Sequence, residues 1–342
     1  MRILLATAVA IAPLMVATGS QAEIVVSTAR TTPIQTSNAT GTGPDNIRIA
    51  SGGSVAVASG AAVTLDSNHT VDLDSGGSIT MDKSADGSTG LLVNGGNTGS
   101  VIVGGSITVN DTQETADVKD TDGDGDLDGP FATGTGRYGV RVAGPSPFTG
   151  DVLVESTGAI TVEGANSYGL AVETGLNGKL QSLGTIRATG DNAAAIRTTG
   201  PITGNVDLAG TISALGANAS GVSIEGDVGG ALKIHSSVVA TGYRYTTPPP
   251  ARPATGSYDN ATTLFLDELD ADDLLQGGPA VRVGANVAGG VLLDKALAYS
   301  AAGIDGDDDG DGIKNGDEDD DGDGVKNRDD TDRDGDGIPD AS

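Results

Sequence analysis

The chain has 342 residues, a formal net charge of −28, 54 glycines, no cysteine and 3% aromatic residues. Such acidity argues against binding to nucleic acids or anionic membranes and favours cations as ligands. Without cysteine, no disulfide can hold the fold. Abundant glycine with few aromatics suits either a disordered chain or a solenoid of thin strands and tight turns.

Residues 1–22 are predicted to form a secretory signal peptide. Arg2 precedes an apolar run, Ile3 to Val16, that is short for a membrane span, and Ser20 to Ala22 offer small residues for cleavage. An N-terminal anchor helix is the alternative, but no charged stop-transfer flank follows. We therefore expect an exported protein whose mature chain begins at Glu23.

From residue 47 onward, apolar residues alternate in i, i+2 pairs, as in short strands with one buried face. The first pairs recur about every eight residues: Ile47/Ile49, Val55/Val57, Val63/Leu65, Val71/Leu73 and Ile79/Met81. A strict 26-residue period then runs through the middle of the chain: Gly164, Gly190, Gly216, Gly242; Leu170, Ile196, Val222; Leu180, Val206, Leu232; Ile186, Ile212, Val238. A fixed period of this size indicates a solenoid, in which each unit buries its apolar face against its neighbours.

Within one period the strand starts step by 10, 6 and 10 residues, which predicts three short strands per coil. We therefore expect an all-β fold: a parallel β-helix over residues 23–300, with about seven coils between residues 47 and 299 and a length of roughly 35 Å. A left-handed hexapeptide helix has only about 18 residues per coil, so the right-handed form is predicted.

Asparagine recurs at one corner, as Asn166, Asn192 and Asn218. These residues predict either a stacked amide ladder or a backbone in the left-handed region, which asparagine tolerates. Both interpretations are structural.

The period is interrupted twice, by insertions at about 110–136 and 243–277. Both fall at the same one of the three corners, four coils or about 19 Å apart. The acidic tail leaves the last predicted strand, Leu297/Tyr299, at that corner too. Because equivalent corners of a solenoid lie on one edge, the interruptions predict a binding edge.

Each insertion carries a candidate site. The first contains an incomplete calcium motif, since its twelfth position is Phe131: Asp120, Asp122, Asp124 and Asp128. In the second, Tyr243 and Tyr245 are candidates for a contact patch, with ordinary packing on the coil edge as the alternative.

Residues 301–342 are predicted to be a calcium-binding array without flanking helices. Oxygen ligands at positions 1, 3, 5, 7, 9 and 12, with glycine at 6, are the pattern by which a loop encloses Ca²⁺. Three tandem registers, the last cut off before position 12, give these candidate ligands: Asp307, Asp309, Asp311, Ile313, Asn315, Glu318; Asp319, Asp321, Asp323, Val325, Asn327, Asp330; Asp332, Asp334, Asp336, Ile338, Asp340. Without the ion, charge at this density is expected to keep the segment unfolded.

The tail, over residues 307–340, resembles thrombospondin type 3 calcium repeats, although the cysteines of the animal repeats are absent. The signal peptide, the Gly-Thr-Ile-x-Ala and Asn-x-x-Gly-Val-x-Ile repeats and the insertions resemble the passenger region of bacterial autotransporters (type V secretion) over nearly all of residues 1–300. The likeness is to the large β-helical passengers common in alphaproteobacteria such as sphingomonads. That resemblance implies export, passage through an outer-membrane translocator and display at the surface of a Gram-negative cell. The family ends in a translocator barrel. No such strands precede Ser342, so we expect a truncated passenger, with a soluble secreted relative as the alternative.

The sequence leaves three functions open. The favoured one is a monomeric surface-displayed or secreted structural or adhesive module, ordered by calcium, that contacts an extracellular glycan, matrix or neighbouring cell and is not an enzyme. The second is a polysaccharide lyase or hydrolase, but Arg141, Arg187 and Arg197 look scattered, without nearby carboxylate clusters. A protease is least favoured, because the two histidines, His69 and His235, read as turn or coil-edge residues and no Gly-Asp-Ser-Gly motif is present.

Overall fold

The computed structural model describes residues 23–112, 131–242, 251–252 and 277–293. Apart from one short 3-10 helix, η1 (Thr36–Asn38), the regular structure in these ranges is β-strand. Within them no helix is long and apolar enough to cross a membrane. The predicted all-β class is confirmed.

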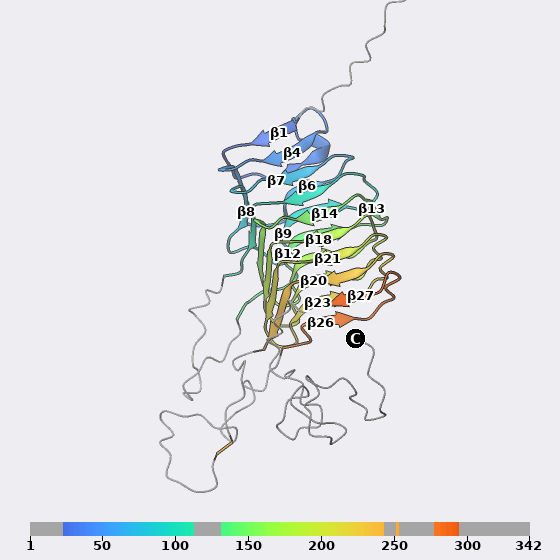
Figure 1. Ribbon diagram of the computed structural model, residues 1–342. Coiled ribbons are helices and arrows are strands. Elements are labelled where there is room, and N and C mark those ends of the chain that lie inside the picture. Colours follow the sequence, from blue (N-terminus) through green and yellow to red (C-terminus); the bar gives the residue numbers. More distant parts are fainter. Residues whose placement is uncertain (1–22, 113–130, 243–250, 253–276, 294–342) are drawn as a thin grey trace, which may run out of the picture.

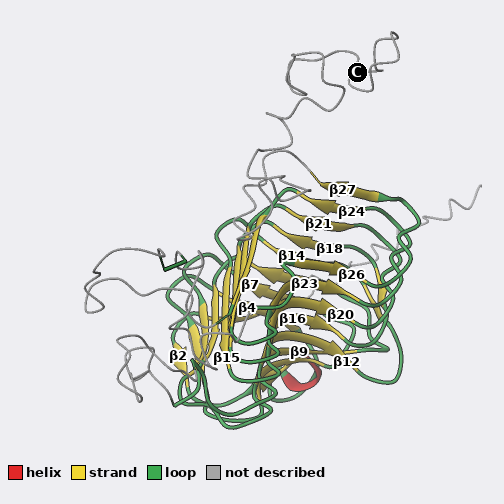
Figure 2. Ribbon diagram, turned by 90° about the horizontal axis from the view of Figure 1, so that it is seen from below, coloured by secondary structure: helices red, strands yellow, loops and turns green. Residues whose placement is uncertain are grey.

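Three parallel sheets stack their strands along one axis to form a solenoid (Figures 1 and 2). The first sheet contains β1 (Glu23–Val26), β4 (Asn46–Ile49), β7 (Val71–Leu73), β10 (Val101–Val103), β14 (Val152–Val154), β18 (Leu180–Ser182), β21 (Val206–Leu208), β24 (Leu232–Ile234) and β27 (Val291–Leu293). The second contains β2 (Ala29–Arg30), β5 (Ser54–Ala56), β8 (Ser78–Met81), β11 (Ser106–Val109), β15 (Ala159–Glu163), β19 (Thr185–Thr189), β22 (Thr211–Leu215) and β25 (Ser237–Thr241). The third contains β3 (Ile34–Gln35), β6 (Ala61–Leu65), β9 (Thr89–Asn94), β12 (Tyr138–Ala143), β16 (Tyr168–Val172), β20 (Ala194–Thr198), β23 (Ser220–Ile224) and β26 (Val281–Val283).

The chain visits the first, second and third sheets in turn, so one round of three strands makes one coil. Two coils in the middle of the rod have an additional short strand in the connection from the third sheet back to the first. These strands, β13 (Phe148–Thr149) and β17 (Leu176–Asn177), pair with each other. The described solenoid has about eight turns. It begins with β1 at Glu23, before residue 47, from which the coils were counted; the other two strands of the first coil, β2 and β3, have only two residues each and show no alternation.

The core is the column of inward residues that the i, i+2 pairs predicted. The inward residues from β4 to β24 of the first sheet lie in register and are fully buried: Ile47, Val71, Val101, Val152, Leu180, Val206 and Leu232. Parallel strands lie about 4.8 Å apart, so each apolar side chain packs on its equivalent in the next coil. Val291 lies in β27, at the end of the described coils, and is 50% exposed. The predicted strand Leu297/Tyr299 lies outside the described residues.

Candidate functional site: the insertion corner

Both interruptions of the period fall where the chain passes from the second sheet to the third, which we call the insertion corner. The first lies between β11 and β12 and the second between β25 and β26. In the second sheet, β11 and β25 are four strands apart. The predicted placement of both insertions on one edge is confirmed.

The described ends of the first insertion are held together by Asp111, whose side chain is buried. Its carboxylate accepts hydrogen bonds from the backbone nitrogen of Thr133 and, at 3.2 Å, from the Thr133 hydroxyl. Thr112 and Thr133 place their hydroxyls 3.4 Å apart. The insertion therefore leaves and re-enters the coil at nearly one point.

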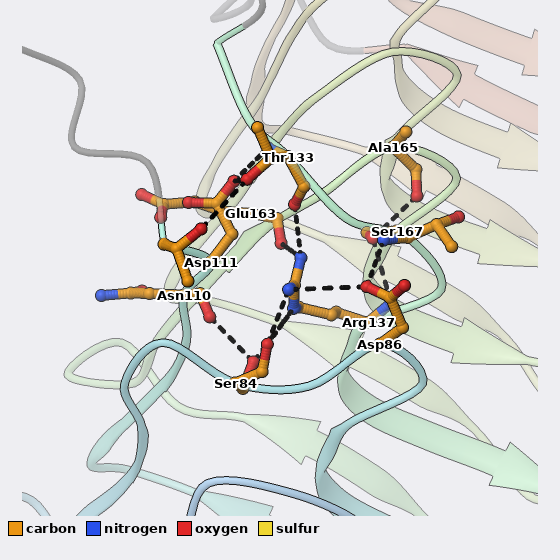
Figure 3. A network of polar contacts seen from close by, with 11 residues as sticks. Ser84, Asp86, Asn110, Asp111, Thr133, Arg137, Glu163, Ala165 and Ser167 are labelled. Carbon is orange, nitrogen blue, oxygen red and sulfur yellow. Dashed lines mark hydrogen bonds and ion pairs between the residues drawn. The ribbon is translucent and has the colours of Figure 1, made fainter. Parts of the chain in front are cut away.

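Arg137 fixes the corner beside this neck (Figure 3). Its side chain is 4% exposed, and its guanidinium donates to backbone carbonyls from three separate segments. Nη2 lies 2.6 Å from the Ser84 oxygen, and Nη1 lies 2.7 Å from the Thr133 oxygen and 3.1 Å from the Glu163 oxygen. Asp86 is 3.7 Å away but 61% exposed, so carbonyl dipoles supply most of the compensation for the buried charge.

Ser84 and Ser167 extend this network to the neighbouring turns. Ser84 donates to the Asn110 carbonyl at 2.8 Å and accepts from Arg137 Nε at 3.0 Å. Ser167 accepts from the Arg137 backbone nitrogen at 3.0 Å and donates to the Ala165 carbonyl. One buried cation thus ties three successive coils together where the first insertion joins them.

The recurring asparagines at the same corner adopt a left-handed backbone conformation. Asn166, Asn192 and Asn218 have φ of 49°, 55° and 56°, in the left-handed region. The second of the two interpretations drawn from the sequence is therefore the one that the structure supports.

The outer face of the third sheet carries a ladder of aromatic and charged side chains beginning at this corner. Tyr138 and Tyr168 lie in register, with ring centroids 5.4 Å apart. Arg141 stacks over Tyr138 at 4.2 Å and forms an ion pair with Glu173 at 2.8 Å. Burial and a hydrogen bond with Glu173 raise the pKa of Tyr138 to about 12.

Two coils further along, Arg197 repeats this arrangement. It lies 5.2 Å from the Tyr168 ring and pairs with Glu225 at 3.0 Å. Hydrogen bonding to Arg197 lowers the pKa of Glu225. Arg141 and Arg197 each pair with one carboxylate that lies about 30 residues away in sequence, because the stacking of coils brings the two side chains together.

A second charged cluster lies on the outer face of the first sheet. Arg48 pairs with Asp74 at 2.7 Å and with Glu23 at 3.7 Å. Burial raises the pKa of the neighbouring Asp72 carboxyl, and the charges of Asp74 and Glu155 raise it further. No pattern in the sequence marks this cluster, since its members come from different coils.

The metal and contact residues singled out in the sequence lie outside the described residues. These are the array within 301–342, the weaker motif Asp120 to Asp128, and Tyr243 with Tyr245. Within the described ranges, no group of three or more His, Asp or Glu side chains could hold a metal ion.

Sequence reasoning also missed Arg137, Tyr138 and Tyr168. A signal existed for the tyrosines: each stands two residues before an inward residue of the period, Val140 or Leu170, so they occupy equivalent places in neighbouring coils. No comparable signal marks Arg137, whose partners are backbone carbonyls.

No family model, curated protein or solved structure matches this chain. Its function must be argued from the solenoid and its surfaces.

Proposed function

We propose that this protein is a surface-displayed or secreted structural and adhesive β-solenoid that presents binding segments from one edge. The observation that carries the proposal is the placement of both insertions at the insertion corner, four coils apart in one sheet. Solenoids offer extended surfaces on a rigid frame, and insertions on one edge can act together on a large ligand.

The Arg137 network supports this role. A loop that merely tolerates extra residues needs no buried cation at its base, whereas a displayed segment gains affinity when its ends are held in place. The proposed ligand is an extracellular glycan, matrix component or neighbouring cell surface. Export by the signal peptide, passage through outer-membrane machinery, surface location in a Gram-negative bacterium and Ca²⁺ binding by residues 301–342 belong to the same proposal.

The test is deletion of the first insertion. Asp111 and Thr133 are hydrogen-bonded to each other, so residues 113–130 can be removed and the ends joined by a short linker. We expect loss of adhesion to cells or immobilised extracellular glycans with unchanged circular dichroism. A second variant deletes 253–276 from the other insertion and tests the same edge four coils away. If neither deletion weakens adhesion, the insertion corner is not the binding edge.

A polysaccharide lyase or hydrolase is the second candidate, and the Asp72 cluster favours it. A carboxyl group with a raised pKa beside other carboxylates and an arginine can serve as a general acid. Turnover of a polysaccharide that is abolished by Asp72→Asn, but kept in Asp207→Asn on the same face, would support the enzyme. The absence of turnover across a panel of acidic and neutral polysaccharides would exclude it for those substrates.

A further inference from the structure

The outer face of the second sheet carries two columns of hydroxyl groups. In each strand from β5 to β25, two outward positions lie two residues apart, and both are in register from coil to coil. The first column contains Ser54, Ser78, Ser106, Thr185, Thr211 and Ser237, interrupted by Ala159. The second contains Thr80, Thr108, Thr161 and Ser213, with Ala56, Arg187 and Val239 at the remaining places.

These hydroxyls are free to bind a ligand. All are at least partly exposed, and none forms a hydrogen bond with another residue in the part of the chain that the structure describes. The other outer faces differ, because Arg141 and Arg197 on the third sheet and Arg48 on the first are paired with carboxylates. The hydrogen-bonding capacity of this face is therefore not used within the described fold.

Charge defines the kind of ligand. In a chain of net charge −28, these two columns carry a single ionisable side chain, Arg187. The columns offer an acidic polymer one cation, the exposed Arg187, and offer a basic polymer no anion. A neutral ligand whose own surface presents many hydroxyls can both donate to and accept from serine and threonine.

The spacing of the hydroxyls indicates the form of the ligand. Hydroxyls recur about every 4.8 Å along the rod and about 6.7 Å along each strand. One neutral hydrogen bond contributes little in water. Many hydrogen bonds on a rigid lattice add up when the partner is also rigid and repeating, since little further ordering is needed on binding.

We propose that this hydroxyl face, the two columns on strands β5 to β25, binds a neutral polysaccharide packed as an ordered fibre or sheet. This contact is separate from the insertion corner. It would hold the rod flat on a polysaccharide surface, leaving the insertion edge to one side.

The experiment is co-sedimentation of the mature chain with microcrystalline cellulose as the probe, at low and high salt. We expect binding that salt does not change and that carboxymethylated cellulose does not reproduce. The triple variant Thr80→Val, Thr108→Val, Thr161→Val removes three neighbouring hydroxyls and keeps β-branched side chains, so binding should weaken at least about tenfold.

The matched control is Thr64→Val, which removes an outward hydroxyl from the third sheet and should bind like the unmodified protein. Should the triple variant fold poorly, the single variant Thr108→Val must still bind more weakly than Thr64→Val. Failure of the unmodified protein to sediment, binding that salt abolishes, or equal binding by the face and control variants would overturn the proposal. Deleting 113–130 must leave this binding unchanged, which separates it from the function proposed for the insertion corner.

Discussion

Replacing Arg137 by alanine removes the side chain that holds the insertion corner, and the structure gives the size of the effect. The substitution leaves the carbonyls of Ser84, Thr133 and Glu163 without their charged donor. A hydrogen bond to a charged group contributes about 1.5–3 kcal/mol, but the three are not additive because they share one side chain. Because the loss leaves neutral carbonyls without a donor rather than a buried charge without a partner, we expect a cost of about 2–3 kcal/mol.

The measurement is urea unfolding of the mature chain followed by circular dichroism, combined with limited proteolysis at the neck of the first insertion. The matched control is Arg197→Ala on the neighbouring face, whose arginine is 33% exposed and pairs with Glu225. Because exposed pairs contribute little, the control should lose about 1 kcal/mol or less. If Arg137→Ala destabilises the protein no more than Arg197→Ala, the buried network does not hold the corner.

Three further predictions concern other parts of the chain. Gly190 has φ of 136°, and a Cβ there would overlap the Gly164 carbonyl oxygen, so Gly190→Ala should lower the free energy of unfolding by at least about 2 kcal/mol in urea titrations; an unchanged midpoint would show that the coils can separate locally. Burial and the charge of Asp74 raise the folded-state pKa of Asp72, so the contribution of this carboxyl group to the stability of the fold falls as the pH rises through that pKa. Asp72→Asn should therefore be more stable than the unmodified protein at neutral pH, and the difference should vanish in acid. The opposite pH trend would contradict the raised pKa. Chelation of calcium should make residues 305–342 protease-sensitive while the circular dichroism of the solenoid persists; a tail whose cleavage does not respond to chelator binds no structural calcium.

The sequence predicted the coil well because the solenoid is a local repeat. An inward residue such as Leu170 packs on Ile196, its equivalent one coil away, so the apolar residues of the core recur in the sequence at a fixed spacing. The period also located both insertions at one corner, because extra residues between two strands of a strict period can be recognised whatever the length of the insertion. It failed at the first coil, where β2 and β3 have only two residues each.

Polar clusters could not be predicted in this way. Arg141 and Glu173 are 32 residues apart, and nothing in the period says that a side chain of one coil will reach toward the next. The contacts of Arg137 are still harder to predict, because its partners are backbone carbonyls. Every residue has such a carbonyl, so no pattern of residue types marks these partners in the sequence.

The sequence by itself therefore determined the class of fold, the length of the coil and the edge from which the insertions leave, because these follow from periodic burial of apolar side chains. Only the tertiary structure decided which outward side chains meet. It paired the arginines of the third sheet with carboxylates, buried Arg137 among carbonyls, and left the hydroxyl face unpaired. Stacking puts residues that are one coil apart in sequence within about 4.8 Å, and whether they bond then depends on the reach and direction of each side chain.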